Sequence, residues 1–423
     1  MMVRAGVGLA DITPPAGLAM TGFGARTLPA EGAHDRLTAR ALVIGETAIV
    51  VADVLGIDAD MSERIRARSG LPPEAVVVAA VHNHGGPVSM PERLGAKADA
   101  DYLRMLEDGC VKAISRARQT AVEAELYFGY GEDPGIARNR RRADGPVDRA
   151  LPVLAVRDRA GETIAVLVSY ACHPVVLDAT NLLWTADYPH FVRAGIEAAF
   201  PGATALFLTG CAGDINTGHS AHASLSLEQN AARSFDAANA IGKAIANCVL
   251  AASLQPIAGN GTGYGEAFAS LHFERRETEP LEDLARAWDE EAKTAPAVGQ
   301  AVLPIWARWA RRFAADRLDP LRARTSALCW GEVGLVALPG EVFSQTSLDL
   351  RAAMGMDGFV ICYAGDNPGY IPPASEYAHG GYEIDEAHRY YGMPATFAKG
   401  SAEALSDAAL RALGRAGTQK SAT

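Results

Sequence analysis

The sequence contains no run close to the roughly 20 apolar residues that span a bilayer, and its first residues lack the apolar core of a secretory signal. We therefore expect a cytoplasmic protein without a membrane partner. Basic residues are also few, since 39 Lys and Arg stand against 50 Asp and Glu and the net charge is −11. Phosphate backbones require an excess of basic residues, so we expect no nucleic-acid partner.

Paired cysteine spacings are absent as well. Six cysteines are scattered along 423 residues, which is typical of reduced, buried thiols in a cytosolic protein. Cys172 and Cys211 each follow an apolar strand-like run and could be thiol nucleophiles. A buried, inert thiol is the more common outcome at such a position, and it is the one we expect.

Short β-branched runs alternate with amphipathic segments along the chain. The runs that predict strands are 47–54, 74–81, 125–131, 152–158, 163–171, 204–210 and 333–340, and the segments that predict helices are 101–119, 228–252 and 401–417. Residues 281–318 have a helical pattern interrupted around Pro296 and Pro304. We expect one α/β domain over residues 1–423 with a helical insertion at about 281–318.

Polar residues gather where the predicted strands end, at 81–87, 169–174, 208–219 and 336–343. Proteins of the α/β class build their sites in loops beyond strand ends. Residues 366–383 form a long loop rich in Gly, Pro and Tyr, and loops of that length in a compact domain are usually functional.

Two histidines and one glutamate stand at three of these strand ends. His82 and His173 each close an apolar strand, and Glu341 follows a third. Zinc accepts imidazole nitrogen and carboxylate oxygen, and a catalytic site keeps one position open. The same side chains could instead be hydrogen-bonded loop residues, because no compact signature such as H-E-x-x-H is present. Residue types alone leave both interpretations open.

A resemblance favours the metal. The sequence resembles the neutral (non-lysosomal) ceramidase family in the stretches VGLADITPPAGLAMTGFG, HDRLTARALVI, VHNHGGP, LPGE and GYIPPASEYAHGGYE, which run in that order from residue 7 to residue 383. The resemblance implies mixed β-sheets flanked by helices, with a zinc site at the strand ends. It also implies that Gly85, Gly86 and Pro87 form a turn that lets the backbone approach the site.

The family's zinc ligands fall on His82, His173, Glu341 and Tyr370 of this sequence. The substrate-contacting tyrosine falls on Tyr382, twelve residues after Tyr370 as in the family.

We interpret His82 and His84 as pointing to opposite faces of a strand. We therefore expect His84 to be a catalytic residue outside the ligand set that faces away from the zinc, towards the substrate or a group that supports the ligands. Arg140, in RNRRR, matches the family's substrate-contacting arginine, although the run could simply be a solvated charge cluster.

The sequence departs from the family at its catalytic serine, where Asn216 stands within GDINTG. Asn cannot act as such a nucleophile, so we expect a water activated by zinc. Asp214 is then the expected general base, with Asp187 in reserve, and Asn216 could donate a hydrogen bond to an oxyanion. Either aspartate could instead cap a turn or a helix.

We therefore expect a zinc-dependent hydrolase acting on the linear amide of a small polar molecule. The alternatives are a metal-dependent hydrolase or lyase of sugar-like or lactone substrates, and an inactive metal-bound scaffold. The family's C-terminal β-sandwich is not expected here. Zinc cannot be separated from other divalent ions by these ligands, and the oligomeric state stays open. Trp288, Trp306 and Trp309 could line a pocket mouth but are spaced for helix packing.

Overall fold

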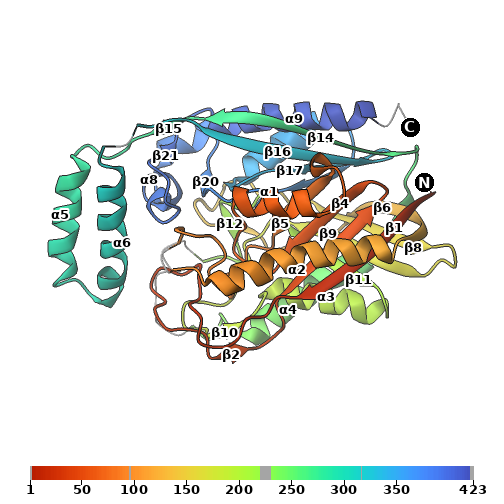
Figure 1. Ribbon diagram of the computed structural model, residues 1–423, viewed down its shortest axis with the longest axis horizontal. Helices are drawn as coiled ribbons and strands as arrows, with labels where there is room; N and C mark the ends of the chain where they lie inside the picture. The colour runs from red at the N-terminus through yellow and green to blue at the C-terminus, as the bar shows by residue number, and fades with distance from the viewer. Residues whose placement is uncertain (1, 95–96, 220–229, 316, 420–423) are drawn as a thin grey trace.

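The computed structural model of the protein describes residues 2–94, 97–219, 230–315 and 317–419 (Figure 1). Its largest sheet has nine strands among these residues, in the order β11-β9-β8-β6-β1-β3-β4-β5 with β13 paired to β6. The strands are β1 Met2–Asp11, β3 Thr38–Ile44, β4 Thr47–Ala52, β5 Val76–Ala80, β6 Val122–Gly131, β8 Leu151–Asp158, β9 Thr163–Tyr170, β11 Thr204–Thr209 and β13 Gln255–Pro256. β11 with β9 and β4 with β5 are parallel and the other pairs antiparallel, so the sheet is mixed.

Helices cover both faces of this sheet, and the side chains of its strands divide between them with a period of two. Along β3, Ala41 and Val43 belong to the core under α1 (Ala59–Arg68) and α2 (Ala100–Gln119). Leu42 and Ile44 belong instead to the core shared with two other helices, α3 (Tyr188–Ala199) and α4 (Phe235–Leu250). This burial on both faces explains why the predicted strands read as nearly continuous apolar runs.

A second sheet has the order β14-β16-β17-β19 and is covered by the long C-terminal helix α9 (Ser401–Gln419), which Figure 1 shows along its outer face. Its strands are β14 Thr262–Leu271, β16 Leu321–Trp330, β17 Val333–Ala337 and β19 Gly358–Ile361. The short pairs are β2 Gly32–Ala33 with β10 Leu183–Trp184, β7 Arg138–Asn139 with β12 Ile215–Asn216, β15 Phe273–Glu274 with β21 Thr396–Phe397, and β18 Glu341–Val342 with β20 Tyr370–Ile371. The remaining helices are α7 Ser344–Ala353 and α8 Tyr382–Asp385, with 3-10 turns η1 Pro73–Ala75, η3 Ala374–His379 and η4 Ala387–Arg389.

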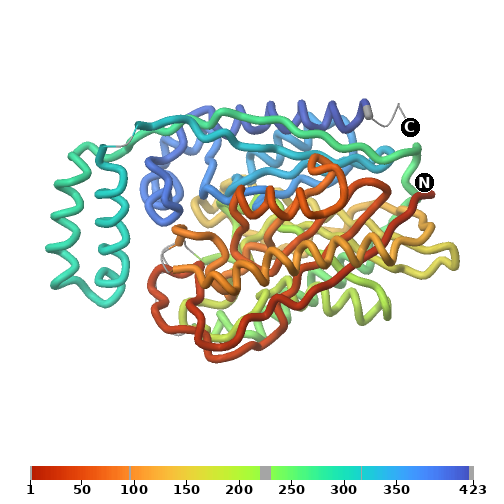
Figure 2. Tube along the Cα trace, viewed as in Figure 1, coloured from red at the N-terminus to blue at the C-terminus, as the bar shows by residue number. Residues whose placement is uncertain are grey.

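The predicted helical insertion is a hairpin of α5 (Leu281–Ala292) and α6 (Ala297–Phe313) that stands out from the body (Figure 2). Pro296 is the residue before α6, as the break in the pattern predicted, but Pro304 lies inside the helix. A proline in a helix removes one backbone hydrogen bond without necessarily ending it. The hairpin has its own apolar cluster, which includes Leu281, Trp309 and Phe313.

The mixed sheets flanked by helices confirm the expected fold class. All seven predicted strands are present, and so are the predicted helices within one or two residues, except that α4 begins only at Phe235. Residues 228 and 229 of that predicted helix lie outside the described residues. Strands β1, β3, β14 and β16 were not predicted, since their many small residues weaken the strand pattern. None of the described helices is long and apolar enough to cross a membrane.

A buried ion pair joins α3 to the end of β4. The Arg193 guanidinium donates two hydrogen bonds to Asp53, at 2.6 and 3.0 Å, and both residues are almost inaccessible to solvent. Asp53 also accepts bonds from the backbone N–H and the hydroxyl of Thr38, at 2.7 and 2.8 Å. Asp53 precedes Val54 and Leu55, whose carbonyls hold His82, so this pair fixes one side of the region described below.

We expect Arg193→Met to lower the free energy of unfolding by about 3 kcal/mol or more, because it leaves the Asp53 carboxylate buried without its cation. Denaturant unfolding monitored by circular dichroism measures the change. Arg104→Met is the matched control, since Arg104 pairs with Asp101 on the exposed surface of α2 and such pairs contribute little. Equal losses in the two variants would contradict the assignment.

Candidate functional site

His82 lies two residues beyond β5 and is held in an uncommon conformation. Its backbone φ is 69°, and its N–H donates to the Val54 carbonyl at 2.9 Å. The ring Nδ1 donates to the Leu55 carbonyl at 2.7 Å, and the Tyr363 ring stacks on the imidazole with centroids 3.9 Å apart. Tyr363 also has a positive φ, of 58°. Such backbone strain is often found at functional sites.

His173 is anchored in the same manner beyond β9. Its Nδ1 lies 2.5 Å from the Ala212 carbonyl and 3.0 Å from the Ile215 carbonyl. Since a carbonyl only accepts, Nδ1 carries the hydrogen in both histidines, and each neutral ring presents the lone pair of Nε2. Burial, with the nearby Arg140, lowers the pKa of His173 to about 4, so this ring is uncharged at neutral pH.

Both lone pairs point at one carboxylate. Glu341 Oε2 lies 3.3 Å from His82 Nε2 and 2.9 Å from His173 Nε2. The Tyr391 hydroxyl donates to the other oxygen, Oε1. The Glu341 carboxylate is completely buried.

This donor set fits a cation. Two imidazole lone pairs and a carboxylate oxygen repel one another unless a proton or a metal ion lies between them, and His82 Nε2 is buried without a hydrogen-bond partner. Backbone carbonyls that fix the Nδ1–H of each ring are the usual supports of histidine ligands. His82, His173 and Glu341 are thus brought together, as the sequence predicted.

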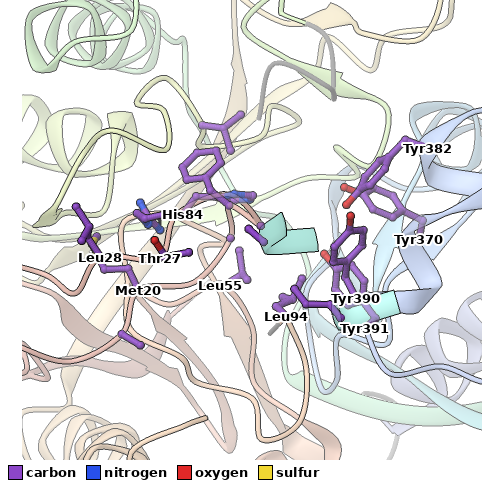
Figure 3. Close-up of a pocket in the computed structure, with 18 of the residues that line it drawn as sticks. Met20, Thr27, Leu28, Leu55, His84, Leu94, Tyr370, Tyr382, Tyr390 and Tyr391 are labelled. Carbon is purple, nitrogen blue, oxygen red and sulfur yellow. Dashed lines mark hydrogen bonds between the residues drawn. The ribbon is translucent and has the colours of Figure 1, made fainter. Parts of the chain in front are cut away.

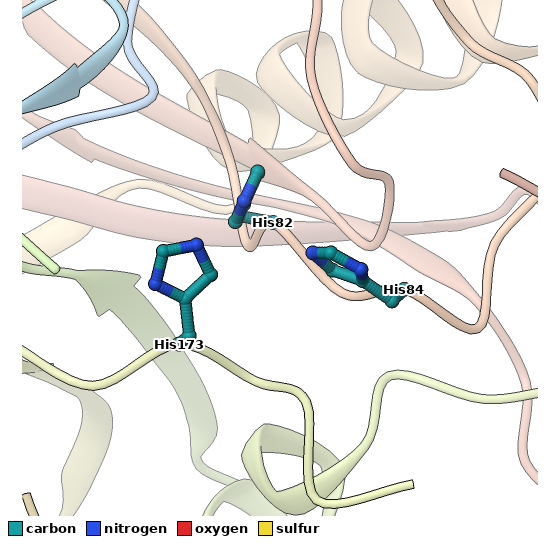
Figure 4. Close-up of side chains that lie close together, drawn as sticks. All are labelled: His82, His84 and His173. Atoms are coloured by element: carbon teal, nitrogen blue, oxygen red, sulfur yellow. The ribbon is translucent and has the colours of Figure 1, made fainter. Parts of the chain in front are cut away.

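His84 differs from our expectation. Its ring lies in the same cluster, and one nitrogen of each of His82, His84 and His173 falls within 4.8 Å of the others (Figure 4). The expectation that it faces away is wrong, because the chain leaves β5 before His82 and turns through the positive φ of that residue, which brings the centroids of the two rings within 5.1 Å of each other. Both ring nitrogens are buried without a partner among the described residues, and burial, with His82 and His173, lowers its pKa well below the usual value.

Two glycines allow the close approach around His84. A Cβ on Gly22, whose φ is 96°, would lie 2.6 Å from the His84 ring, and a Cβ on Gly85 would lie 2.6 Å from Thr185. Only glycine fits at either position. The close approach of Gly85 is to Thr185, so the expectation that this turn brings the backbone to the site stays a prediction.

Tyr370 stands beside Glu341 because β18 and β20 are parallel with these two residues in register. Its hydroxyl accepts a hydrogen bond from Arg140 Nη2 at 2.9 Å, and Arg140 Nε donates to Glu383 at 2.9 Å. The Tyr382 ring lies 5.8 Å from that of Tyr370. The structure thus gathers Tyr370, Arg140 and Tyr382 around the cluster, although no ligand bond to Tyr370 is assigned.

The basic run RNRRR is buried in part and not a solvated cluster. Arg141 bonds Glu376 at 3.1 Å and Glu383 at 2.6 Å, and Arg142 bonds Glu376 at 3.1 Å. Both glutamates belong to the loop 366–383, so these ion pairs hold the loop that carries Tyr370 and Tyr382 against the body of the protein.

Asp214 and Asn216 are tied into the backbone instead of facing the pocket. Asp214 accepts the Ser344 N–H at 2.8 Å and the Asn139 amide at 2.8 Å, which uses both carboxylate oxygens, and burial raises its pKa to about 6. Asn216 accepts the N–H of Gly218 at 2.8 Å and donates to the His219 carbonyl at 2.7 Å. The roles of base and oxyanion donor that we expected therefore gain no support from the geometry.

Asp187 caps a helix, and the two candidate cysteine nucleophiles are buried thiols. Asp187 caps α3, accepting the Tyr188 N–H at 2.7 Å, and also accepts the Leu177 N–H at 3.0 Å. Burial raises its pKa to about 6. Cys172 and Cys211 are completely buried, and burial raises the pKa of each thiol well above its usual value.

A pocket of about 310 Å³ opens beside the cluster. Figure 3 shows His84 with Met20, Thr27 and Leu28 on one side and four tyrosines on the other. Its lining comprises the N-terminal loop residues Ala19, Met20, Gly22, Phe23, Gly24, Arg26, Thr27 and Leu28, the residues Leu55, His84, Leu94, Arg140 and Val175, the α6 residues Ala301, Ile305 and Arg308, and Tyr370, Tyr382, Tyr390 and Tyr391. The predicted tryptophans are not among them. Instead Trp288 and Trp306 pack together with centroids 5.3 Å apart.

Several site residues were missed. Tyr391 bonds Glu341, Tyr363 stacks on His82, and Arg26 donates to the His84 carbonyl at 2.6 Å. Each reaches the site across a long sequence separation, so no local pattern marked it. The doublet Tyr390-Tyr391, beside a loop already rich in tyrosine, was the one available signal.

The chain is similar to known proteins in both sequence and fold. Residues 3–206 match the family model for the N-terminal domain of neutral/alkaline non-lysosomal ceramidases. The neutral ceramidase of Pseudomonas aeruginosa is 28% identical over 237 residues, which are 47% of this chain and 35% of that protein, so the match spans about a third of the relative's length.

The fold similarity is wider. The crystal structure of that neutral ceramidase superposes with a TM-score of 0.76 at 18% identity, covering 99% of this chain and 75% of the other. A structure described as ceramidase complexed with C2 gives a TM-score of 0.74, also at 18% identity, over 97% of this chain and 74% of the other. The chain is therefore similar to the neutral ceramidase family in sequence over residues 3–206, and it shares the fold of neutral ceramidase over nearly its whole length.

Proposed function

We propose that this protein is a zinc-dependent hydrolase that cleaves an amide bond of a small molecule with a water nucleophile. The observation that carries the proposal is the convergence of the His82 and His173 lone pairs on the Glu341 carboxylate beside an open pocket. The family supports hydrolysis of an amide. A pocket of about 310 Å³ also favours an enzyme over an inactive scaffold, in which side chains would fill the cleft.

The metal would be held by His82, His173 and Glu341, with Tyr370 as the fourth ligand that the family implies. A zinc ion bound there would polarise a carbonyl oxygen and lower the pKa of water towards neutrality. Tyr391 holds the second oxygen of Glu341 and so orients the carboxylate towards the two imidazoles.

His84 is the side chain best placed to move protons. Its ring is in the pocket lining, and both nitrogens are without hydrogen-bond partners among the described residues, so a ring nitrogen is available to a water or substrate in the pocket. In this role His84 accepts a proton from the attacking water and returns it to the leaving nitrogen. This role replaces the one we expected for Asp214.

Arg140 and Tyr382 would contact the substrate from the opposite wall. The small polar substrate that we expected would require a polar pocket. The rest of the lining is less polar than that, since Met20, Leu28 and Leu55 all belong to it. We therefore propose an amide that joins a short apolar acyl group to a polar amine.

His173→Ala should abolish stoichiometric zinc binding, because it removes one of two imidazole ligands. Inductively coupled plasma mass spectrometry of protein dialysed against zinc measures the loss. His272→Ala is the control, since His272 is exposed and outside the pocket lining. A wild-type protein that takes up no zinc under these conditions would rule out the metal site.

Tyr391→Phe should weaken zinc binding by about 10- to 100-fold, because the Glu341 oxygen loses the hydrogen bond that orients it. Competition with a fluorescent chelator gives the affinity. Tyr390→Phe is the matched neighbour, as Tyr390 lines the pocket without any bond to Glu341. Indistinguishable affinities for the two variants would show that Tyr391 does not support the ligand.

Hydrolysis itself is tested with a panel of N-acyl amines of increasing acyl length. We expect zinc-loaded protein to release amine, and His84→Gln to lower kcat by about 100-fold or more while zinc content stays the same. If zinc is lost in proportion to activity, His84 is a ligand and not the proton carrier. Absence of amine release across the panel would refute the proposed function.

A further inference from the structure

The charged side chains that line the pocket all have one sign. They are Arg26, Arg140 and Arg308, and no described Asp or Glu is part of the lining. The chain as a whole has the opposite balance, with a net charge of −11. The three arginines differ in whether other residues of the protein bond or neutralise their guanidinium groups.

Two of the three arginines are committed to the fold. Arg140 pairs with the Glu383 carboxylate at 2.9 Å and bonds the Tyr370 hydroxyl at 2.9 Å. The guanidinium of Arg26 donates to backbone carbonyls, including those of His84 at 2.6 Å and Asn181 at 3.2 Å. Arg26 thereby holds the loop over the cluster, and few of its donors remain for a ligand.

Arg308 is different. In the part of the chain that the structure describes, it makes no hydrogen bond, ion pair or ring contact, and it is exposed. Ala301, Ile305 and Arg308 follow a spacing of four and three residues, which places them on one face of α6, and all three line the pocket. The neighbouring arginines of α6 have partners, since Arg311 pairs with Asp289 and Arg312 with Glu92.

We propose that Arg308 binds an anionic group of the substrate at the α6 side of the pocket, and that the amide substrate therefore carries a carboxylate or a similar oxyanion on its amine portion. A guanidinium presents a planar pair of donors that matches such groups. The apolar residues Met20, Leu28 and Leu55 would accommodate the acyl group. The substrate class is then an N-acyl amino acid or an N-acyl aminosulfonate.

This inference rests on the proposed function for its chemistry. Water adds to the amide carbonyl, the C–N bond breaks, and the products are a short-chain carboxylate and a free amine that takes up the proton. No oxidant, reductant or second substrate is required. Recognition of the anion by Arg308 does not depend on this step and can be measured without it.

The test uses zinc-loaded protein and ketones that cannot be hydrolysed, in which a methylene replaces the amide nitrogen of N-hexanoylglycine. Isothermal titration calorimetry compares the carboxylate, the corresponding sulfonate and the uncharged primary carboxamide. We expect the carboxylate, the sulfonate or both to bind about tenfold more tightly than the carboxamide, which is the scale of one charged contact. The stronger of the two identifies the group.

Arg308→Gln should remove this preference and leave carboxamide binding unchanged, and Arg308→Lys should restore part of it. Arg311→Gln is the control, because Arg311 carries the same charge on the same helix but lies outside the pocket lining. The proposal is overturned if the carboxamide binds as tightly as both anions, if no ketone binds, or if Arg308→Gln keeps the preference. Failure of amide hydrolysis with an intact Arg308-dependent preference would refute the proposed function alone.

Discussion

The Glu341 carboxylate is the group on which the rest of the site depends. It is completely buried, and an isolated buried charge would be too costly to keep. Its two oxygens are met by His82 and His173 on one side and by Tyr391 on the other. These partners come from distant parts of the chain, so the carboxylate fixes how the large sheet, the second sheet and the tyrosine loops meet.

A second set of buried charges supports the first. Arg140 and Arg141 reach Glu383, and Arg141 and Arg142 reach Glu376, so one basic segment holds the loop that follows Tyr370 at two points. These ion pairs hold the Arg140 guanidinium in one position at the pocket wall. The wall opposite His84 is thus preorganised before a substrate binds.

Much of this could be predicted from the sequence, and the failures share a cause. Apolar runs identified the strands, and polar residues at strand ends made His82, His173 and Glu341 candidates, because both signals are local; the family resemblance then favoured a metal over loop hydrogen bonds. The orientation of His84 was misjudged from strand periodicity. Asp214 and Asn216 have the residue types of catalytic groups, but whether their oxygens face a cavity or a backbone N–H depends on segments far away, such as Ser344. Tyr391 and Arg308 were invisible for the same reason.

The α5–α6 hairpin has one consequence for how this protein could acquire new substrates. It has its own small apolar cluster, separate from the cores beneath the sheets, yet it supplies part of the pocket wall. The opposite side of α6 packs against Tyr370, Tyr390 and Tyr391, so only its exposed, pocket-lining positions such as Arg308 can change without disturbing Glu341. Variation at these few positions is a route by which selection, or a protein engineer, could redirect the enzyme while the residues that hold Glu341 stay in place.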